Sequence, residues 1–417
     1  MRRRFARIRG TLADTRPLST PAFRRLWLAG IVTVVGAQLS VVAVPFQIYE
    51  LTGSSAYVGL TGLFGLVPLI VFGLWGGAIA DAMDRRTLLI ITATGIAVSS
   101  LALWVITVAN VGNVWVVLSV FALQQAFLAV NQPTRGALLP RLLPNDQLPA
   151  ANALNMLVFT FGAILGPLLA GALLPIIGLG TLYLLDAIAL TATLWATWML
   201  PRMPPTASDT PRRAGLRDVI AGFVFLARQK ILLVSFLVDV IAMGFGMPRA
   251  VFPEAAVHTF GDPPGGGPAL GWLYAAMPIG AMAGALFSGW LHRVTRQGVA
   301  VTVSICVWGL GVTFFGLVGS LWLAVVFLAI GGAADTVSAV FRSTMLQVVA
   351  TDEMRGRMQG VFIVVVAGGP RLADVWHGPA AAAGGTAFAA AAGGVAVVVL
   401  TIAVVALLPA FWRYRAA

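Results

Sequence analysis

Charged residues are scarce in this chain. Asp, Glu, Lys and Arg make up 10% of its 417 residues, whereas hydrophobic residues make up 59%. A soluble domain carries roughly 25% charged residues, and no soluble core of this length needs so much apolar surface. The composition therefore excludes an ordinary soluble protein and indicates a membrane protein.

Several reactive residue types are almost absent. Cys306 is the only cysteine, which excludes an intrachain disulfide and a metal site built from cysteines alone. The three histidines, His258, His292 and His377, lie in separate segments without the spacing of metal ligands. Lys230 is the only lysine and follows no glycine-rich loop, so the chain has no P-loop for ATP. We expect no metal, no cofactor and no enzymatic activity.

Long apolar runs fill the chain instead. A helix needs roughly 20 apolar residues to cross a bilayer, and about twelve segments approach or exceed that length. They lack the alternation of period 2 that a membrane β-barrel requires. The predicted fold is all-α, with twelve transmembrane helices at 24–48, 56–80, 87–108, 114–134, 152–176, 180–200, 231–253, 269–291, 298–319, 321–345, 358–382 and 387–410.

A proline-rich stretch divides these segments into two sets of six. We predict an N-terminal half at residues 1–200, a cytoplasmic linker at 201–230 and a C-terminal half at 231–417. Within the linker, residues 216–230 are apolar in the middle and basic at both ends, which predicts a helix at the membrane interface.

The basic residues alternate along the chain. They crowd the N-terminus and every second link, a pattern that places those links and both termini in the cytoplasm. The net charge of +12 is therefore spread over separate links that contact anionic lipid, and nucleic-acid binding is not expected. The basic links hold Arg85 and Arg86; Arg135 and Arg141; Arg202 through Lys230; Arg293 and Arg296; Arg342, Arg355 and Arg357; and Arg413 and Arg415.

The two halves share a local sequence pattern. The stretch RGALLPRLLPNDQLPAAN begins at Arg135, and RSTMLQVVATDEMRGRMQ begins at Arg342, 207 residues later. The arginine, an apolar pair and an acidic residue coincide. This indicates a duplication, and transporters built from two repeats hold their site between halves that rock about it.

The link between the second and third segments resembles the signature loop of the major facilitator superfamily. It reads GAIADAMDRR, with Ala82 and Asp84 at positions where the family has a basic residue and a glycine. The resemblance implies that the Asp81 carboxylate helps to close an inner gate near the start of the eleventh helix. Alternatively, the two arginines only set orientation. The candidate gating residues are Gly77, Asp81, Arg85 and Arg86.

The fifth segment contains GAILGPLLAG, which is similar to the motif of proton-coupled exporters in this superfamily, with Ala170 at one glycine position. Its residues are Gly162, Gly166, Pro167 and Gly171. Small residues four apart also let helices pack closely without any antiporter role, and both interpretations stay open.

A finer resemblance, to the enterobactin-exporter branch of the superfamily, rests on several stretches. These are residues 21–30, 42–55, 270–289, 344–361 and 368–374. Members of that branch export siderophores, and near relatives export macrolides, tetracyclines and other amphiphilic drugs. The resemblance implies proton-coupled efflux, with a cavity lined by helices 1, 2, 4, 5, 7, 8, 10 and 11.

Three acids lie within predicted spans, where a charge costs at least ~2.5–3.5 kcal/mol. Burial favours the neutral form of a carboxyl, so Asp239, Asp335 and Asp374 are candidates for the proton-coupling group. Helix–helix hydrogen bonding is the alternative for Asp239 and Asp335. Arg371, three residues before Asp374, is placed to neutralise that acid. Asp186 is expected to be a structural carboxylate on a peripheral helix.

Uncharged polar residues face these acids from the first half. The substrate-cavity candidates are Gln38, Gln124, Gln125, Asn131 and Arg371, of which the arginine would be a counter-charge for an anionic substrate. Buried amides also form ordinary packing hydrogen bonds, and this alternative stays open.

The sequence predicts a proton-coupled secondary transporter of the cytoplasmic membrane that exports a siderophore or similar amphiphile by alternating access. Its partners would be the bilayer, protons and a small-molecule substrate, and we expect a monomer. A broad-specificity multidrug efflux pump is the alternative within this class. A non-transporting membrane sensor or scaffold is the alternative outside it.

Overall fold

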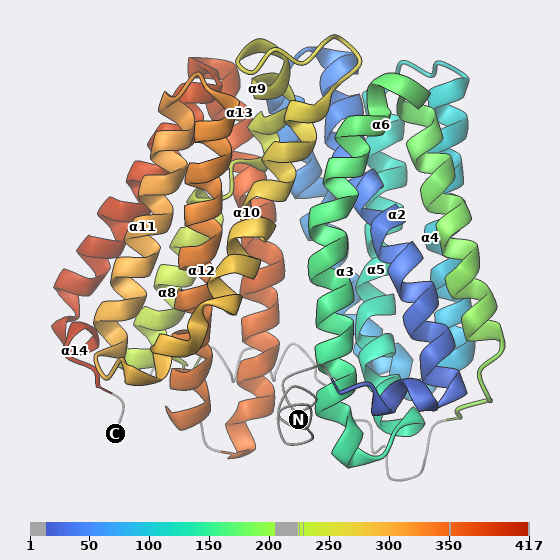
Figure 1. Cartoon of the computed structure of the whole chain (residues 1–417), viewed down its shortest axis with the longest axis horizontal. Helices are drawn as coiled ribbons and strands as arrows, with labels where there is room; N and C mark the ends of the chain where they lie inside the picture. The colour runs from blue at the N-terminus through green and yellow to red at the C-terminus, as the bar shows by residue number, and fades with distance from the viewer. Residues whose placement is uncertain (1–13, 205–223, 225, 228, 350–351, 416–417) are drawn as a thin grey trace, which may run out of the picture.

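The computed structural model describes residues 14–204, 224, 226–227, 229–349 and 352–415. These residues form long helices that run side by side in two groups, one from each half of the chain (Figure 1). The described part contains no strand. Most of the predicted interfacial helix at 216–230 lies outside the described residues.

The first half contains five long helices. They are α2 (Pro21–Thr52), α3 (Ser55–Ala82), α4 (Arg85–Val108), α5 (Val114–Leu142) and α6 (Leu148–Trp198), with the short 3-10 helices η1 (Arg16–Ser19) and η2 (Asn145–Gln147).

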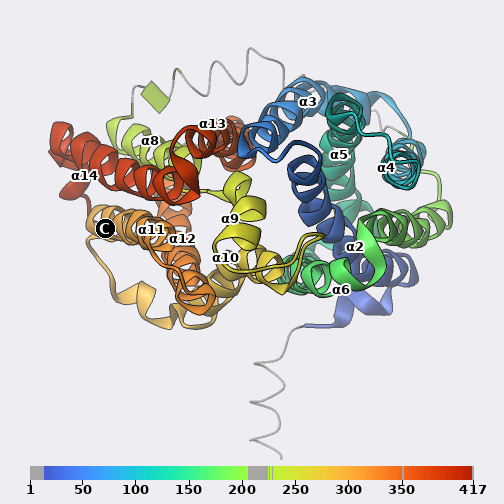
Figure 2. The ribbon, with the colours of Figure 1, turned by 90° about the horizontal axis from the view of Figure 1, so that it is seen from above.

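The second half contains α8 (Lys230–Phe245), α9 (Phe252–His258), α10 (Pro268–Leu286), α11 (Gln297–Leu317), α12 (Leu321–Val349), α13 (Asp352–Leu407) and α14 (Pro409–Trp412). Two 3-10 helices, η3 (Arg249–Val251) and η4 (Ser288–Arg293), connect them. Seen from above, the two groups of helices lie next to each other, with α10 beside α6 (Figure 2).

Two glycines interrupt the longest helices. Gly178 within α6 has φ 76° and ψ 163°, and Gly385 within α13 has φ 85° and ψ 163°, so neither position is helical. Among the described residues ten helices are long and apolar enough to cross a membrane. With α6 and α13 each divided at its glycine, this all-α architecture is consistent with the twelve predicted spans.

The predicted seventh span lies within the candidate span Lys230–His258 but is interrupted, and the predicted eighth span is too long. Residues 231–253 do not form one helix, because α8 ends at Phe245 and Gly246 and Pro248 follow. Similarly, α10 ends at Leu286 rather than at residue 291.

The repeat seen in the sequence extends to the helices. The start of α5 and the start of α12 differ by 207 positions (114 and 321), and so do their ends (142 and 349). The non-helical glycines at 178 and 385 differ by the same number. Arg135 and Arg342 therefore occupy equivalent positions in α5 and α12.

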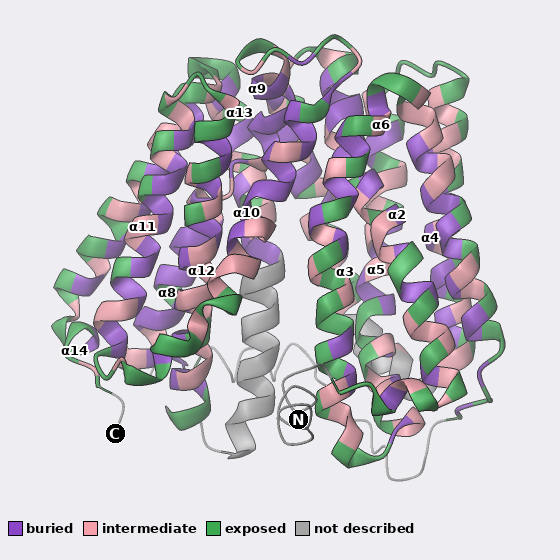
Figure 3. Ribbon diagram, viewed as in Figure 1, coloured by how far each residue is buried: buried purple, intermediate pink, exposed green. Residues whose placement is uncertain are grey.

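Apolar side chains cover the outside of the helical bundle. Buried residues face neighbouring helices, and many large apolar residues on the outer faces are exposed (Figure 3). Ile176, Trp198, Phe287 and Leu407 are examples. The backbone of each span is satisfied within its helix, so these side chains can face lipid at no polar cost.

The two halves meet through glycines at the end of the bundle opposite the termini. A methyl group added to Gly171 of α6 would lie 2.8 Å from the Gly271 Cα of α10. One added to Gly59 of α3 would lie 3.0 Å from the Gly378 Cα of α13. Because glycine has no side chain, the helices can approach closely at these contacts. We call the contacts of Gly171 with Gly271 and of Gly59 with Gly378 the glycine seam.

Asp84 fastens the link that precedes α4. It caps the helix by accepting a 2.9 Å hydrogen bond from the Thr87 backbone amide, and its other oxygen accepts a 2.7 Å bond from the Met203 amide. Partial burial acts to raise the pKa of Asp84, but the hydrogen bonds, with that from Thr87 the largest, outweigh burial and lower it below 3.8. The aspartate at the family's glycine position thus joins α4 to the segment that follows α6.

We predict that Gly178→Ala and Gly385→Ala each destabilise the protein. A side chain at these dihedral angles costs about 1–3 kcal/mol. Gly73→Ala is the control, because it lies in α3 with open space around it. The measurement is thermal unfolding in detergent. Unchanged melting of both variants would contradict the assigned backbone conformation.

We also predict that Asp84→Ala lowers the free energy of unfolding by about 0.5–2 kcal/mol, the usual value of a helix cap. The pKa of Asp84 is lowered by folding, so its ionised form stabilises the protein above pH 3.8. That stabilisation is lost as the pH falls through the folded pKa. Melting curves of both proteins at pH 7 and at about pH 3 should therefore converge on acidification. A constant difference would show that the charge contributes nothing.

Candidate functional site

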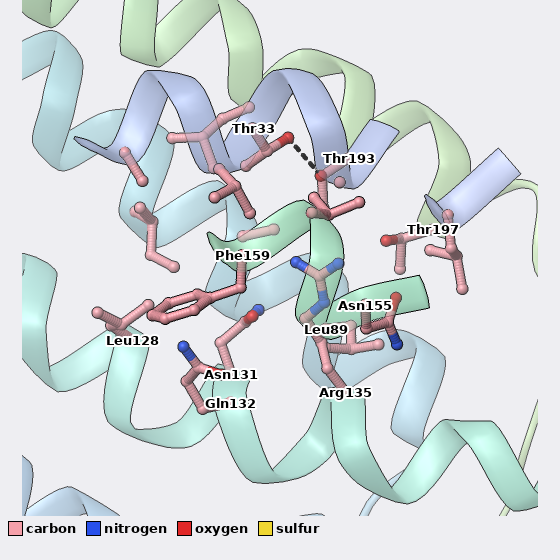
Figure 4. A pocket seen from close by; sticks show the side chains of 18 of the residues that line it. Thr33, Leu89, Leu128, Asn131, Gln132, Arg135, Asn155, Phe159, Thr193 and Thr197 are labelled. Carbon is pink, nitrogen blue, oxygen red and sulfur yellow. Dashed lines mark hydrogen bonds between the residues drawn. The ribbon is translucent and has the colours of Figure 1, made fainter. Parts of the chain in front are cut away.

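A cavity of about 530 Å³ lies within the first half. Its lining residues come from α2, α4, α5 and α6, and include Phe121, Leu128, Met156 and Phe159. Figure 4 shows polar side chains reaching into the space from several helices. The cavity is large enough for an amphiphilic small molecule and is mainly apolar, as ligand sites usually are.

One wall of the cavity carries a polar network around Asp186. This carboxylate is 1% exposed and accepts hydrogen bonds from the hydroxyls of Ser40 (2.6 Å) and Ser100 (2.8 Å). Gln124 donates to the Ser100 hydroxyl at 2.9 Å. The second oxygen of Asp186 has no hydrogen-bond partner within the described chain. The expectation of a purely structural carboxylate is therefore incomplete, because Asp186 also lines the cavity.

Of the other residues predicted to line the cavity, some do so and one packs against a neighbouring helix instead. Asn131 lines the cavity and donates to the Thr92 hydroxyl at 2.8 Å. Gln125 also lines it. Gln38 does not, because its side chain packs against Gly166 of α6.

Arg135 lies inside the cavity, not in a cytoplasmic link as its place in the charge pattern predicted. It belongs to α5, and its guanidinium projects between Asn155 on one side and Asn131 and Phe159 on the other (Figure 4). Nη2 of the guanidinium lies beside Gly30 of α2.

The second half contains a buried cluster of charges. Arg342 of α12 forms an ion pair with Asp239 of α8, and its Nη2 lies 3.6 Å from Oδ1 of Asp335, two turns earlier on α12. The side chains of Arg342 and Asp239 are only 5% and 1% exposed. The structure thus brings together two of the three predicted proton-coupling acids.

The sequence pattern does not identify Arg342 as a functional residue, because Arg342 lies near the end of a predicted span. It was counted among the orientation charges of a link, and this assignment is wrong because the residue is buried within α12. Two signals were available. Asp335 and Arg342 are seven residues apart, which places them on one helix face, and Arg342 aligns with Arg135.

The third acid, Asp374, lies on α13 apart from this cluster. Its electrostatic neighbours are Arg249, Arg371 and the backbone of Ala250. Arg371 itself donates a 2.6 Å hydrogen bond to the Gln125 side chain of α5, so it joins the second half to the first. In this structure Arg371 therefore has a protein partner.

The two family motifs lie on α3–α4 and on α6. The side chains at Gly77 and Asp81 are outside the described residues. Arg85 donates to the carbonyl of Ala137, and Arg86 donates to the carbonyl of Trp198. Both arginines therefore hold helix ends together.

In the second motif, Gly162 packs against Val34 of α2, and Gly171 packs against Gly271. Pro167 contributes its carbonyl to the same contact with Gly271. The motif therefore mediates close packing, within the first half and across to the second, and the antiporter role stays a hypothesis.

Comparison with known proteins identifies relatives of this chain. It is 30% identical over 348 residues to the enterobactin exporter EntS of Escherichia coli O1:K1 / APEC, covering 82% of this chain and 81% of that protein. It is 29% identical over 347 residues to EntS of Citrobacter koseri, with the same coverage.

Solved structures of transporters share the fold. The nucleoside transporter NupG matches with a TM-score of 0.70 and 16% identity, covering 94% of this chain and 99% of that chain. A bacterial homologue of the human lysosomal transporter Spinster, solved inward-facing and unoccupied, matches with a TM-score of 0.69 and 16% identity, covering 96% and 97%. At these identities the likeness shows the fold alone.

The family described as transmembrane secretion effector matches residues 12–413. The relatives are named as exporters, and the structural neighbours are transporters. With this match over nearly the whole chain, the protein belongs to the transmembrane secretion effector family of the major facilitator superfamily.

Proposed function

We propose that this protein is a proton-coupled secondary transporter that exports a siderophore or a similar amphiphilic molecule by alternating access. The relatives named as enterobactin exporters support the substrate class and the direction. On this proposal the protein acts as a monomer, and the end of the bundle that carries both termini faces the cytoplasm.

The observation that carries proton coupling is the buried cluster of two acids and one arginine. One guanidinium neutralises one carboxylate. If both acids were ionised, the cluster would hold a net negative charge in a medium of low dielectric, which is strongly unfavourable. The cluster therefore favours binding one proton, shared between Asp239 and Asp335.

Asp335 is the better proton carrier of the two. Asp239 pairs directly with Arg342 and is 1% exposed, whereas the Oδ1 of Asp335 is 3.6 Å from the guanidinium and its side chain is 27% exposed. Weaker pairing favours protonation, and partial exposure gives the proton a route to water. Asp239 would stay ionised and hold Arg342 in place.

Alternating access requires that the charge cluster between α8 and α12 becomes accessible from each face of the membrane in turn. In this structure the halves are closed at the end opposite the termini by the glycine seam. A proton entering from that face would reach Asp335 only after the seam opens. The same movement would expose a bound substrate there, so that proton entry and substrate release share one step.

We predict that Asp335→Asn abolishes export against a gradient but keeps passive exchange of substrate, because the asparagine cannot titrate. Purified protein in liposomes with an imposed pH gradient would be assayed with enterobactin. Asp146→Asn is the control, since that carboxylate is mostly exposed. Gradient-driven export that survives in both Asp335→Asn and Asp239→Asn would contradict proton coupling through this cluster.

We predict that Gly171→Val shifts the protein toward a state open at the end opposite the termini. The new side chain would collide with the Gly271 backbone and destabilise the closed seam. Spin labels at Gly112 and Gly319, on a background with Cys306→Ala, should report a longer distance. Gly244→Val, which faces open space, should leave the distance unchanged. Equal distances in both variants would argue against rocking about this seam.

A further inference from the structure

The two halves place an arginine at equivalent positions but surround it differently. In the second half, Arg342 has carboxylate partners on α8 and on its own helix. In the first half, the described residues provide Arg135 with neither an ion pair nor a hydrogen bond, although it occupies the same point of the equivalent helix.

The position that would supply the counter-charge holds an apolar residue. The position in α5 equivalent to Asp335 of α12 is Leu128, 207 residues earlier, and Leu128 lines the cavity. Helix α2, which packs beside Arg135 at Gly30, has Glu50 as its one acid, about 30 Å further along at 1.5 Å per residue. Among the described residues, therefore, neither of these positions gives Arg135 a carboxylate partner.

The remaining acid of the cavity, Asp186, serves other groups. It is bonded to Ser40 and Ser100 and lies beside Gly36, whereas Arg135 lies beside Gly30. Along α2, Gly30 is about 9 Å from Gly36 and about 15 Å from Ser40 at 1.5 Å per residue. No ion pair joins Asp186 to Arg135 in the described structure.

A guanidinium inside a membrane protein is costly unless an anion compensates it. The groups around Arg135 cannot do so, because Asn131, Asn155, Thr33 and Thr193 are neutral. Some of these are already engaged, since the hydroxyls of Thr33 and Thr193 bond to each other at 2.7 Å. The cavity therefore presents one positive charge, Arg135, and one acid, Asp186, which is bonded to serine hydroxyls; its other described walls are apolar or neutral polar.

We propose that Arg135 recognises an oxyanion of the transported molecule, such as a carboxylate or phosphate, and that the cargo is an amphiphilic organic anion. The guanidinium binds such a group through two parallel hydrogen bonds, while the apolar part contacts Leu128, Met156 and Phe159. This deepens the proposed function, on which it rests. The proposal assigns anion recognition to Arg135 in the first half. Arg371 then contacts Gln125 and does not bind the anion.

The test restores the missing counter-charge. Leu128→Asp would give Arg135 an internal partner of the kind that Arg342 has, without removing the arginine. Leu128→Asn makes the same change of shape without the charge. Arg135→Gln removes the guanidinium, and Arg293→Gln removes an exposed positive charge outside the cavity.

The full chain would be purified into phosphatidylcholine nanodiscs and titrated with dansyl-glycine and with its methyl ester, using dansyl fluorescence. The unaltered protein and Arg293→Gln should bind the acid more tightly than the ester by about tenfold, or 1.4 kcal/mol. Leu128→Asp and Arg135→Gln should lose that preference. In Leu128→Asn both ligands should weaken equally, which preserves the ratio.

Equal affinity for acid and ester, absence of binding by either, or a preference that survives in Arg135→Gln would overturn the proposal. Loss of the preference when phosphatidylglycerol is added to the disc would do so too, because the oxyanion would then be that of a lipid headgroup. The assay uses no proton gradient. Failed export with a retained acid preference would therefore count against proton coupling alone, and the reverse result against anion recognition alone.

Discussion

A charge inside a membrane needs a counter-charge, and the arrangement of this protein follows from how each buried charge obtains one. Arg342 obtains it from Asp239 and Asp335 within the protein. Asp186 is held by serine hydroxyls. Arg135 has no such partner among the described residues. The ion pair of Arg342 with Asp239 links α8 to α12. Removal of Arg342 would leave two acids uncompensated inside the second half, whereas removal of Asp239 would leave Arg342 with Asp335 alone.

The duplication explains why one fold contains both arrangements. Helices α5 and α12 keep the same length and the same arginine. They differ seven residues before it, where one has Leu128 and the other Asp335. On the proposed function, the second half responds to protons and the first half selects the cargo. Each task then rests on residues that can change without disturbing the other.

Much of the fold follows from the sequence alone. Runs of about 20 apolar residues predict a number of spans with which the structure is consistent. The positions of Gly178 and Gly385 agree with the predicted gaps at 176–180 and 382–387. The interruption of the seventh span was not predicted, because hydropathy remains high past Phe245, where Gly246 and Pro248 end α8.

The charge cluster could be predicted only in part. Asp239 and Asp335 stand out because acids are rare within spans. Arg342 and Arg135 were assigned to links, since an average over a window does not distinguish a charge outside the membrane from one paired inside it. Whether Gln38 faces the cavity or Gly166 depends on helix rotation, which a single sequence does not specify.

The exit of the chain from the first half has a practical consequence. Trp198, Met203 and Pro204 are fastened by Arg86, Asp84 and Arg141, respectively. These three hydrogen bonds hold the end of the first half, up to Pro204, against the helices of that half. If the gene were divided so that the halves are made as two polypeptides, a division after Pro204 would keep all three hydrogen bonds within the first polypeptide. A division a few residues earlier would remove the Met203 amide that bonds to Asp84, and with it the tie between the start of α4 and the end of the first half.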